Sequence, residues 1–252
     1  MLSLALALLA AILTSVLLQS IHLVRSTAGT ILPALAVLVT VLVLLLRRTS
    51  KLVEPLVKEA EKHVIGGRVE MGIKTLESGL RWGLWHPLVP GQLRSMIGTL
   101  YFDTGKLDLA EEHLAKAVRW PWNTKALLGV VLFRKRDESG MIKAFETAVS
   151  VGKKEGLAWT LYAHCLLARE RKDEAVKILE RGLKANPGDQ RLEANLELAR
   201  EGKKLKTAPY GDKWSRFRLD GDGGAPVLPK AARGFAVRPG FRQKPQRKSK
   251  AK

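Results

Sequence analysis

The sequence predicts an all-α protein in three parts: two transmembrane helices, a solenoid of stacked helix pairs, and a disordered basic tail. Two long uncharged stretches near the N-terminus predict the first part, because about 20 apolar residues cross a bilayer core. Apolar residues at three- and four-residue spacing predict helices throughout the centre, where no strand-like alternation occurs. A strongly basic end rich in Pro and Gly predicts the disordered part. We therefore expect boundaries at 1–48, 51–204 and 205–252.

The uneven composition excludes a single soluble globular domain. Lys and Arg outnumber Asp and Glu by 43 to 24 in 252 residues, which gives a net charge of +19. Residues 1–50 hold three arginines and no acid, whereas residues 203–252 hold fifteen Lys and Arg against three Asp. The single cysteine, Cys165, excludes a disulfide scaffold and a cysteine-based zinc site.

Residues 2–24 and 26–46 form the two uncharged stretches. In lipid, a helix satisfies its backbone groups within one segment, so we expect two transmembrane helices. The short link RSTAGT between them predicts a tight antiparallel hairpin. Pro33 is expected near the start of the second helix, where its missing N–H is least costly.

The alternative for the first stretch is a cleaved signal peptide, with Ser26 and Ala28 as small residues near the cut. No Lys or Arg precedes the apolar run, which exceeds the usual length of about 7–15 residues, yet cleavage of 1–25 stays open. Several cations follow the second stretch: Arg47, Arg48, Lys51, Lys58 and Lys62. By the positive-inside rule, we expect a multi-pass protein of the bacterial inner (cytoplasmic) membrane whose C-terminal domain is cytoplasmic.

A repeat of about 34 residues runs through the centre. Small residues recur at positions 98, 129 and 163 and again at 117, 148 and 182, so both series have spacings of 31 and then 34 residues. The most complete copy contains Trp159, Tyr162, Ala163, Ala175, Leu179, Gly182 and Pro187. These residues resemble the tetratricopeptide repeat, a helix–turn–helix unit of about 34 residues.

The resemblance implies a rigid superhelix with a concave side that binds protein or peptide and carries no catalytic machinery. The expected units are repeats at about 53–86, 91–121, 122–155 and 156–189, and a capping helix at 189–204. A polar-faced cap is what the end of a solenoid requires.

The resemblance also places inward-facing residues of the first helices in a partner-binding groove. They are Met96, Thr99, Phe102, Val130, Phe133, Arg134, Leu161, His164 and Leu167. The set lacks the Lys and Asn with which chaperone-binding members hold a C-terminal carboxylate, and its apolar character suits a helix or an extended apolar peptide. Phe102 and Phe133 are expected to be partly exposed in the free protein. For each residue, packing against the next repeat is the alternative.

We expect no catalytic residue, metal ligand or cofactor. The five histidines show no paired ligand spacing, and His164 and Cys165 are adjacent, so on a helix they point about 100° apart. The glycine clusters lack the Lys-Ser/Thr of a phosphate loop, and Gly-x-Ser-x-Gly is missing from the sequence. An enzyme is therefore not expected.

The basic tail is a candidate polyanion-binding segment. After Asp222 it carries only cations: Lys230, Arg233, Arg238, Arg242, Lys244, Arg247, Lys248, Lys250 and Lys252. Aromatic residues including Trp214 and Phe217 interleave with the basic residues. Anionic lipid is one expected partner, and RNA, DNA or a ribosome is another, through counterion release and base stacking. A merely solvated tail stays open.

The sequence thus predicts a membrane-anchored scaffold or adaptor for a protein partner on the cytoplasmic side. The alternative is a tether for nucleic acid or a ribosome through the tail. Partner identity and oligomeric state are left open.

Overall fold

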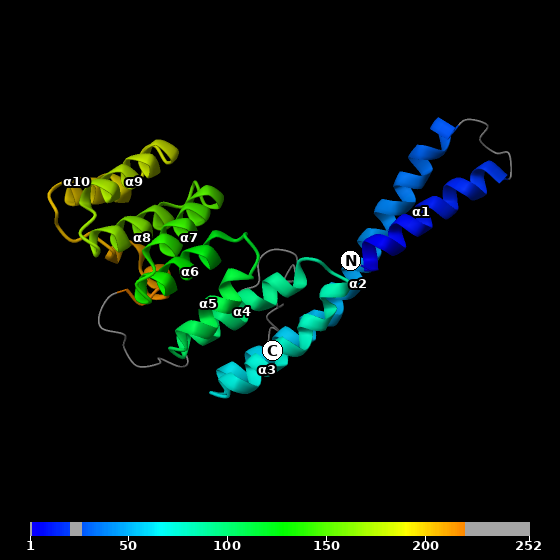
Figure 1. The fold of residues 1–252 in the computed structure, drawn as a ribbon, viewed down its shortest axis with the longest axis horizontal. Coiled ribbons are helices and arrows are strands. Elements are labelled where there is room, and N and C mark those ends of the chain that lie inside the picture. Colours follow the sequence, from blue (N-terminus) through cyan, green and yellow to red (C-terminus); the bar gives the residue numbers. More distant parts are fainter. Residues whose placement is uncertain (1, 21–26, 220–252) are drawn as a thin grey trace, which may run out of the picture.

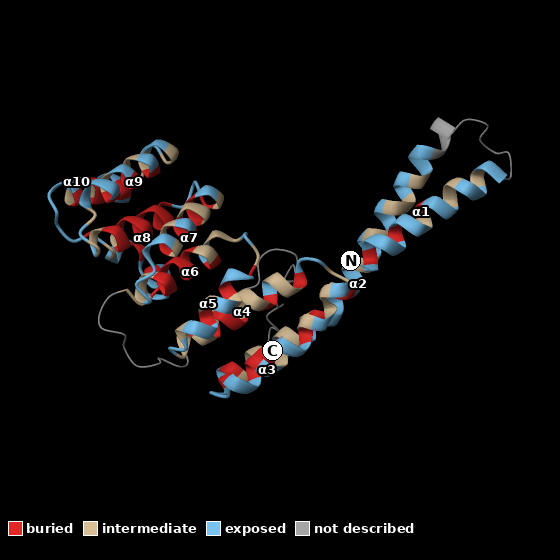
Figure 2. Ribbon diagram, viewed as in Figure 1, coloured by how far each residue is buried: buried red, intermediate tan, exposed pale blue. Residues whose placement is uncertain are grey.

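The computed structural model describes residues 2–20 and 27–219, and all regular elements within these ranges are helical. The N-terminal pair consists of α1 (Leu2–Ser20) and α2 (Thr27–Ile65), which run side by side at one end of the molecule (Figure 1). Both helices are long and apolar enough to cross a membrane, as judged by length and composition. Leu13 and Leu17 on α1 are 68% and 62% exposed, and most of the apolar part of the pair is not covered by protein (Figure 2).

Helix α2 continues without a break across the boundary expected near residue 48 and is 39 residues long. Its C-terminal part packs against α3 (Val69–Ser78) and buries Val53, Ala60 and Val64. The apolar span and the first helix of the first pair are therefore one element. Because α2 begins at Thr27, Pro33 lies in its second turn, near the start of this 39-residue helix.

The remaining helices up to α10 form pairs stacked in chain order (Figure 1). A 3-10 helix, η1 (Gly79–Leu84), connects α3 to the next pair. The pairs are α4 (Val89–Asp103) with α5 (Leu107–Ala115), α6 (Trp122–Arg134) with α7 (Glu138–Val151), and α8 (Gly156–Leu167) with α9 (Lys172–Ala185). Helix α10 (Gln190–Arg200) packs on α8 and α9 at the end of the stack.

Small residues let the two helices of a pair approach closely. A Cβ added at Gly129 would lie 2.7 Å from a ring carbon of Phe145, and one added at Gly182 would lie 2.8 Å from Cγ of Trp159. Ala163 is completely buried on α8. The small residues that recur in the sequence thus lie where a neighbouring side chain already fills the space that a larger side chain would need.

The prediction of disorder from residue 205 is wrong for residues 205–219. This segment contains η2 (Ala208–Tyr210) and α11 (Asp212–Ser215), and it returns from α10 along the stack toward α6 and α8 (Figure 1). Leu205 and the three aromatic side chains of this segment are buried against the repeats, which offsets the entropy lost on ordering them. Residues 220–252, which include every candidate polyanion-binding residue, lie outside the described part of the chain.

Candidate partner-binding groove

The nine residues expected in the groove differ in exposure. Val130 and Leu161 are fully buried, and Phe102 is only 1% exposed, so the expected partial exposure of Phe102 is wrong. The guanidinium carbon of Arg134 lies 5.0 Å from the centre of the Phe102 ring and helps to cover it. The others are partly exposed: Met96, Thr99, Phe133, Arg134, His164 and Leu167.

Phe133 lies beside the end of α8 rather than in open space. The guanidinium carbon of Arg169 lies 4.8 Å from the centre of its ring, and Arg169 Nη2 donates a hydrogen bond of 2.6 Å to the Phe133 carbonyl. This side chain therefore contributes to the joint between two repeats, the packing alternative that the sequence left open.

The concave side of α6, α8 and α10 is occupied by residues 205–219 of the same chain, which we call the groove segment. Three aromatic side chains anchor it, and Tyr210, Trp214 and Phe217 are 7%, 2% and 5% exposed. The Tyr210 hydroxyl lies 2.8 Å from the Thr160 hydroxyl on α8, and the two groups share a hydrogen bond. Each anchor thus reaches the groove with a large apolar surface, and Tyr210 adds a directional polar contact.

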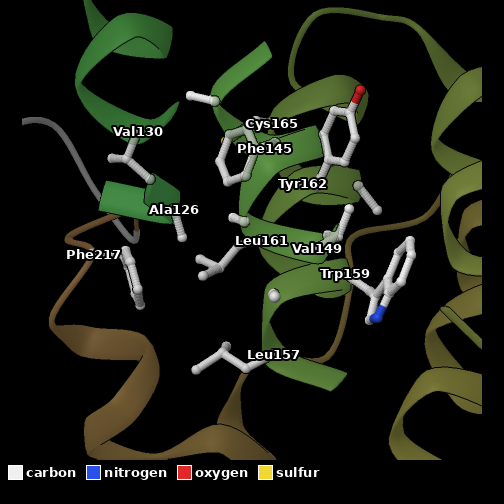
Figure 3. Packing of buried hydrophobic residues seen from close by; sticks show 14 of the residues in the cluster. Ala126, Val130, Phe145, Val149, Leu157, Trp159, Leu161, Tyr162, Cys165 and Phe217 are labelled. Carbon is white, nitrogen blue, oxygen red and sulfur yellow. The ribbon is translucent and has the colours of Figure 1, made fainter. Parts of the chain in front are cut away.

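Trp214 and Phe217 continue the contact along the groove. The Trp214 ring meets His164 edge-on at 5.1 Å between ring centres, and the Phe217 ring stacks with Trp122 at 6.4 Å. Figure 3 shows Phe217 on the side of α8 toward which Leu157 and Leu161 point. The anchors therefore contact α6 and α8 through different side chains.

Helix α8 separates the groove from the interior of its own repeat. Leu157 and Leu161 point toward the groove segment, whereas Trp159 and Tyr162 point to the other side (Figure 3). On that other side, the Tyr162 ring stacks with Phe145 of α7 at 5.2 Å between ring centres. This stack between α7 and α8 is thus separate from the contacts that Leu157 and Leu161 make on the other side of α8.

Polar groups fix the register of the groove segment at both ends. Buried Asn195 on α10 accepts a 2.7 Å hydrogen bond from the Lys206 N–H and donates one of 3.3 Å to the Lys206 carbonyl. At the other end, Arg218 Nη1 donates 2.9 Å to the Asp103 carbonyl, and its Nη2 lies 3.6 Å from Asp103 Oδ1. Arg134 Nη2 donates to the Arg218 carbonyl at 2.5 Å.

Burial dominates the electrostatics of this end of the groove. Burial raises the pKa of the Asp103 carboxyl to about 6, although the Arg218 charge opposes that rise. Burial also lowers the pKa of Arg134, and the neighbouring positive charge of Arg218 lowers it further. The Asp103 carboxyl therefore lies near one guanidinium, that of Arg218, while Arg134 binds the Arg218 carbonyl where the segment ends.

The described residues offer little for catalysis. Burial raises the pKa of the Cys165 thiol far above its usual range, so the reactive thiolate is disfavoured. Within residues 2–20 and 27–219, no cluster of His, Cys, Asp and Glu could hold a metal ion. The arrangement can bind a peptide through apolar and hydrogen-bonding contacts.

In the sequence, Trp214 and Phe217 suggested stacking on nucleic acid, whereas in the fold both side chains are buried against the repeats. Tyr210, Trp214 and Phe217 follow one another at spacings of four and three residues. Such a density of spaced aromatics is unusual for a disordered segment, which is normally poor in them. The spacing of these aromatic residues was the signal available in the sequence. The helices that the segment contacts are up to 115 residues away along the chain, so the sequence pattern alone did not identify them.

Stacked helix pairs define the described part of the chain as an α-solenoid. Profiles of the tetratricopeptide repeat match residues 92–121 and 156–200. The chain therefore contains tetratricopeptide repeats, and the resemblance seen in the sequence is confirmed.

Two solved structures of MamA are similar in fold. One, described as the crystal structure of MamA protein, is 19% identical with a TM-score of 0.49 and covers 72% of this chain and 90% of its own. The other, described as the crystal structure of MamA, is 20% identical with a TM-score of 0.47 and covers 70% and 93%. No curated protein matches the chain.

Proposed function

We propose that this chain is a membrane-anchored scaffold that binds a protein partner on the cytoplasmic side of a bacterial inner membrane. Tetratricopeptide repeats generally serve as protein-interaction scaffolds, and this chain contains such repeats. One observation carries the proposal: the concave side of α6, α8 and α10 already holds a peptide segment through buried aromatic side chains. The surface therefore has the shape and chemistry to bind a peptide from a partner.

The α1–α2 pair supports the anchor. Its apolar side chains are exposed along both helices, and the second apolar stretch ends at Arg47 and Arg48. Cations next to a span favour the cytoplasmic side. Because α2 continues into the first repeat, an anchored chain would hold its groove at a fixed orientation to the bilayer.

Crosslinking in native membranes tests this function. A photoreactive amino acid at Met96 or Thr99 probes α4, the first helix of its pair, where both side chains are partly exposed. The matched control is the same amino acid at exposed Lys177 on α9. We expect a defined protein to crosslink from α4 and not from Lys177. Equal crosslinking from both helices, or none from α4, would contradict the proposal.

The second candidate function is a polyanion tether. It rests on the nine cations that follow Asp222 without an intervening acid. Removing 220–252 should then abolish retention of RNA or anionic vesicles, and retention by the full chain should fall steeply with salt. Retention that survives truncation would contradict the tether, whereas crosslinks from α4 do not depend on the tail.

A further inference from the structure

We propose that the groove segment is a releasable internal ligand, and that the partner enters the groove as a segment of the same chemistry. That chemistry is three aromatic side chains spaced four and three residues apart, followed directly by an arginine. This inference rests on the proposed function, because it names the class of partner and the regulation of the same groove.

The recognition is specific to side-chain identity. Tyr210 shares a hydrogen bond with the Thr160 hydroxyl, the Trp214 ring contacts the His164 ring, and Arg218 contacts the carbonyl and carboxylate of Asp103. These contacts come from α8 and α4, so they require the aromatic spacing and the terminal cation together. An apolar peptide without an arginine at this place would bury apolar surface in the groove but leave the Asp103 carboxyl without the cation that Arg218 supplies.

The groove segment has little structure of its own. Its regular elements are one 3-10 turn and a four-residue helix, so its order depends on the groove. The connection from α10, Glu201 to Lys204, is exposed and contains Gly202 at φ +71°. The ring stack between Tyr162 and Phe145 lies on the opposite side of α8, so release of the segment would leave that contact between α7 and α8 in place.

Two features make the internal ligand an imperfect occupant. Within the described residues, the buried Trp214 Nε1–H has no hydrogen-bond acceptor, and an unpaired buried donor is destabilising. The Asp103 carboxylate is buried next to a single loosely paired guanidinium, at 3.6 Å. A partner segment that buries its aromatic side chain without leaving a donor unpaired, or that brings a cation closer to Asp103, would displace the internal one.

A labelled peptide provides the test. The probe is the segment itself, LKTAPYGDKWSRFRL, added to the full chain in lipid nanodiscs. In the wild type the groove is filled, so we expect weak binding. The double variant Trp214→Ala/Phe217→Ala removes two anchors from the internal copy, and we expect it to bind the probe at least about tenfold more tightly. The matched control is Lys213→Ala/Arg216→Ala, which changes two exposed neighbours and should behave as the wild type.

Equal binding to all three proteins, or no binding to the double variant, would overturn the inference. Hydrogen–deuterium exchange on the wild type gives a test independent of the variants. The amides of 205–219 should exchange by local release, faster than those of α8. Equal protection of both would show that the segment unfolds only with the repeats and would also overturn the inference. If crosslinking from α4 captures no protein, only the proposed function is contradicted. Binding of the labelled peptide is measured without any partner and therefore tests the inference separately.

Discussion

At the residue scale, the packing of the repeats depends on positions where a neighbouring side chain leaves room only for a small residue. Gly129 and Gly182 lie against Phe145 and Trp159, and Ala163 is completely buried. The sequence predicted all three positions from their spacing, because a close approach admits few residue types. It did not predict Asp103 or Asn195, since their roles depend on a segment that reaches them only in the fold.

Ala163→Leu should destabilise the repeats. Three extra carbons in a filled interior force neighbouring helices apart, with an expected loss of about 1–3 kcal/mol in the free energy of unfolding. Thermal or urea unfolding followed by circular dichroism measures this loss. The control is Ala168→Leu at the end of the same helix, where the residue is exposed. An unchanged midpoint for Ala163→Leu would mean that the position is not a close contact.

Asp103 gives the groove a pH dependence. Its pKa is raised from 3.8 to about 6 in the folded chain, so folding favours its protonated form. Its favourable contribution is therefore complete below pH 3.8 and is lost as the pH rises through 6. Relative to Asp103→Asn, the wild type should lose on the order of 2–3 kcal/mol between pH 4 and 7. Urea unfolding of both proteins at several pH values checks this, and parallel pH profiles would contradict it.

At the element scale, periodic helices could be predicted and connections could not. Helices α4 to α10 follow from apolar spacing and from small residues in two series. The continuity of α2 was missed because the charges after Leu46 end a membrane span without ending a helix. The groove segment was missed because a 3-10 turn and a four-residue helix have no periodicity, and its order comes from long-range contacts.

Gly211→Ala should loosen the groove segment while leaving the repeats intact. Gly211 has φ +52° and ψ −133° between η2 and α11, a conformation that costs a residue with a Cβ about 1–3 kcal/mol. A Cβ there meets no atom within 4 Å, so the effect acts through the backbone alone. Hydrogen exchange should become faster across 205–219 with little change in α8. Unchanged exchange in the segment would show that this turn does not hold Tyr210 and Trp214 in place.

At the scale of the whole molecule, the anchor and the groove lie at opposite ends of one continuous stack (Figure 1). Each helix pair packs on the next, and α2 belongs to both the apolar pair and the first repeat. The sequence predicted which side of the stack is concave, because this follows from the repeat. It did not predict that residues 205–219 of the same chain fill that side. Their position depends on contacts with helices that are distant in the sequence.

The orientation of this stack can be tested with thiol labelling. The one native cysteine, Cys165, is buried and should not react, so a single introduced cysteine reports its own location. We expect Lys177→Cys on α9 to be protected from a membrane-impermeant maleimide in intact spheroplasts and labelled after lysis. Ser26→Cys, in the link between the two apolar stretches, should be labelled before lysis. This pattern follows from the cations after Leu46, which favour the cytoplasmic side. Labelling of Lys177→Cys in intact spheroplasts would place the repeats outside and contradict the proposed location, whereas protection at both positions would exclude the hairpin.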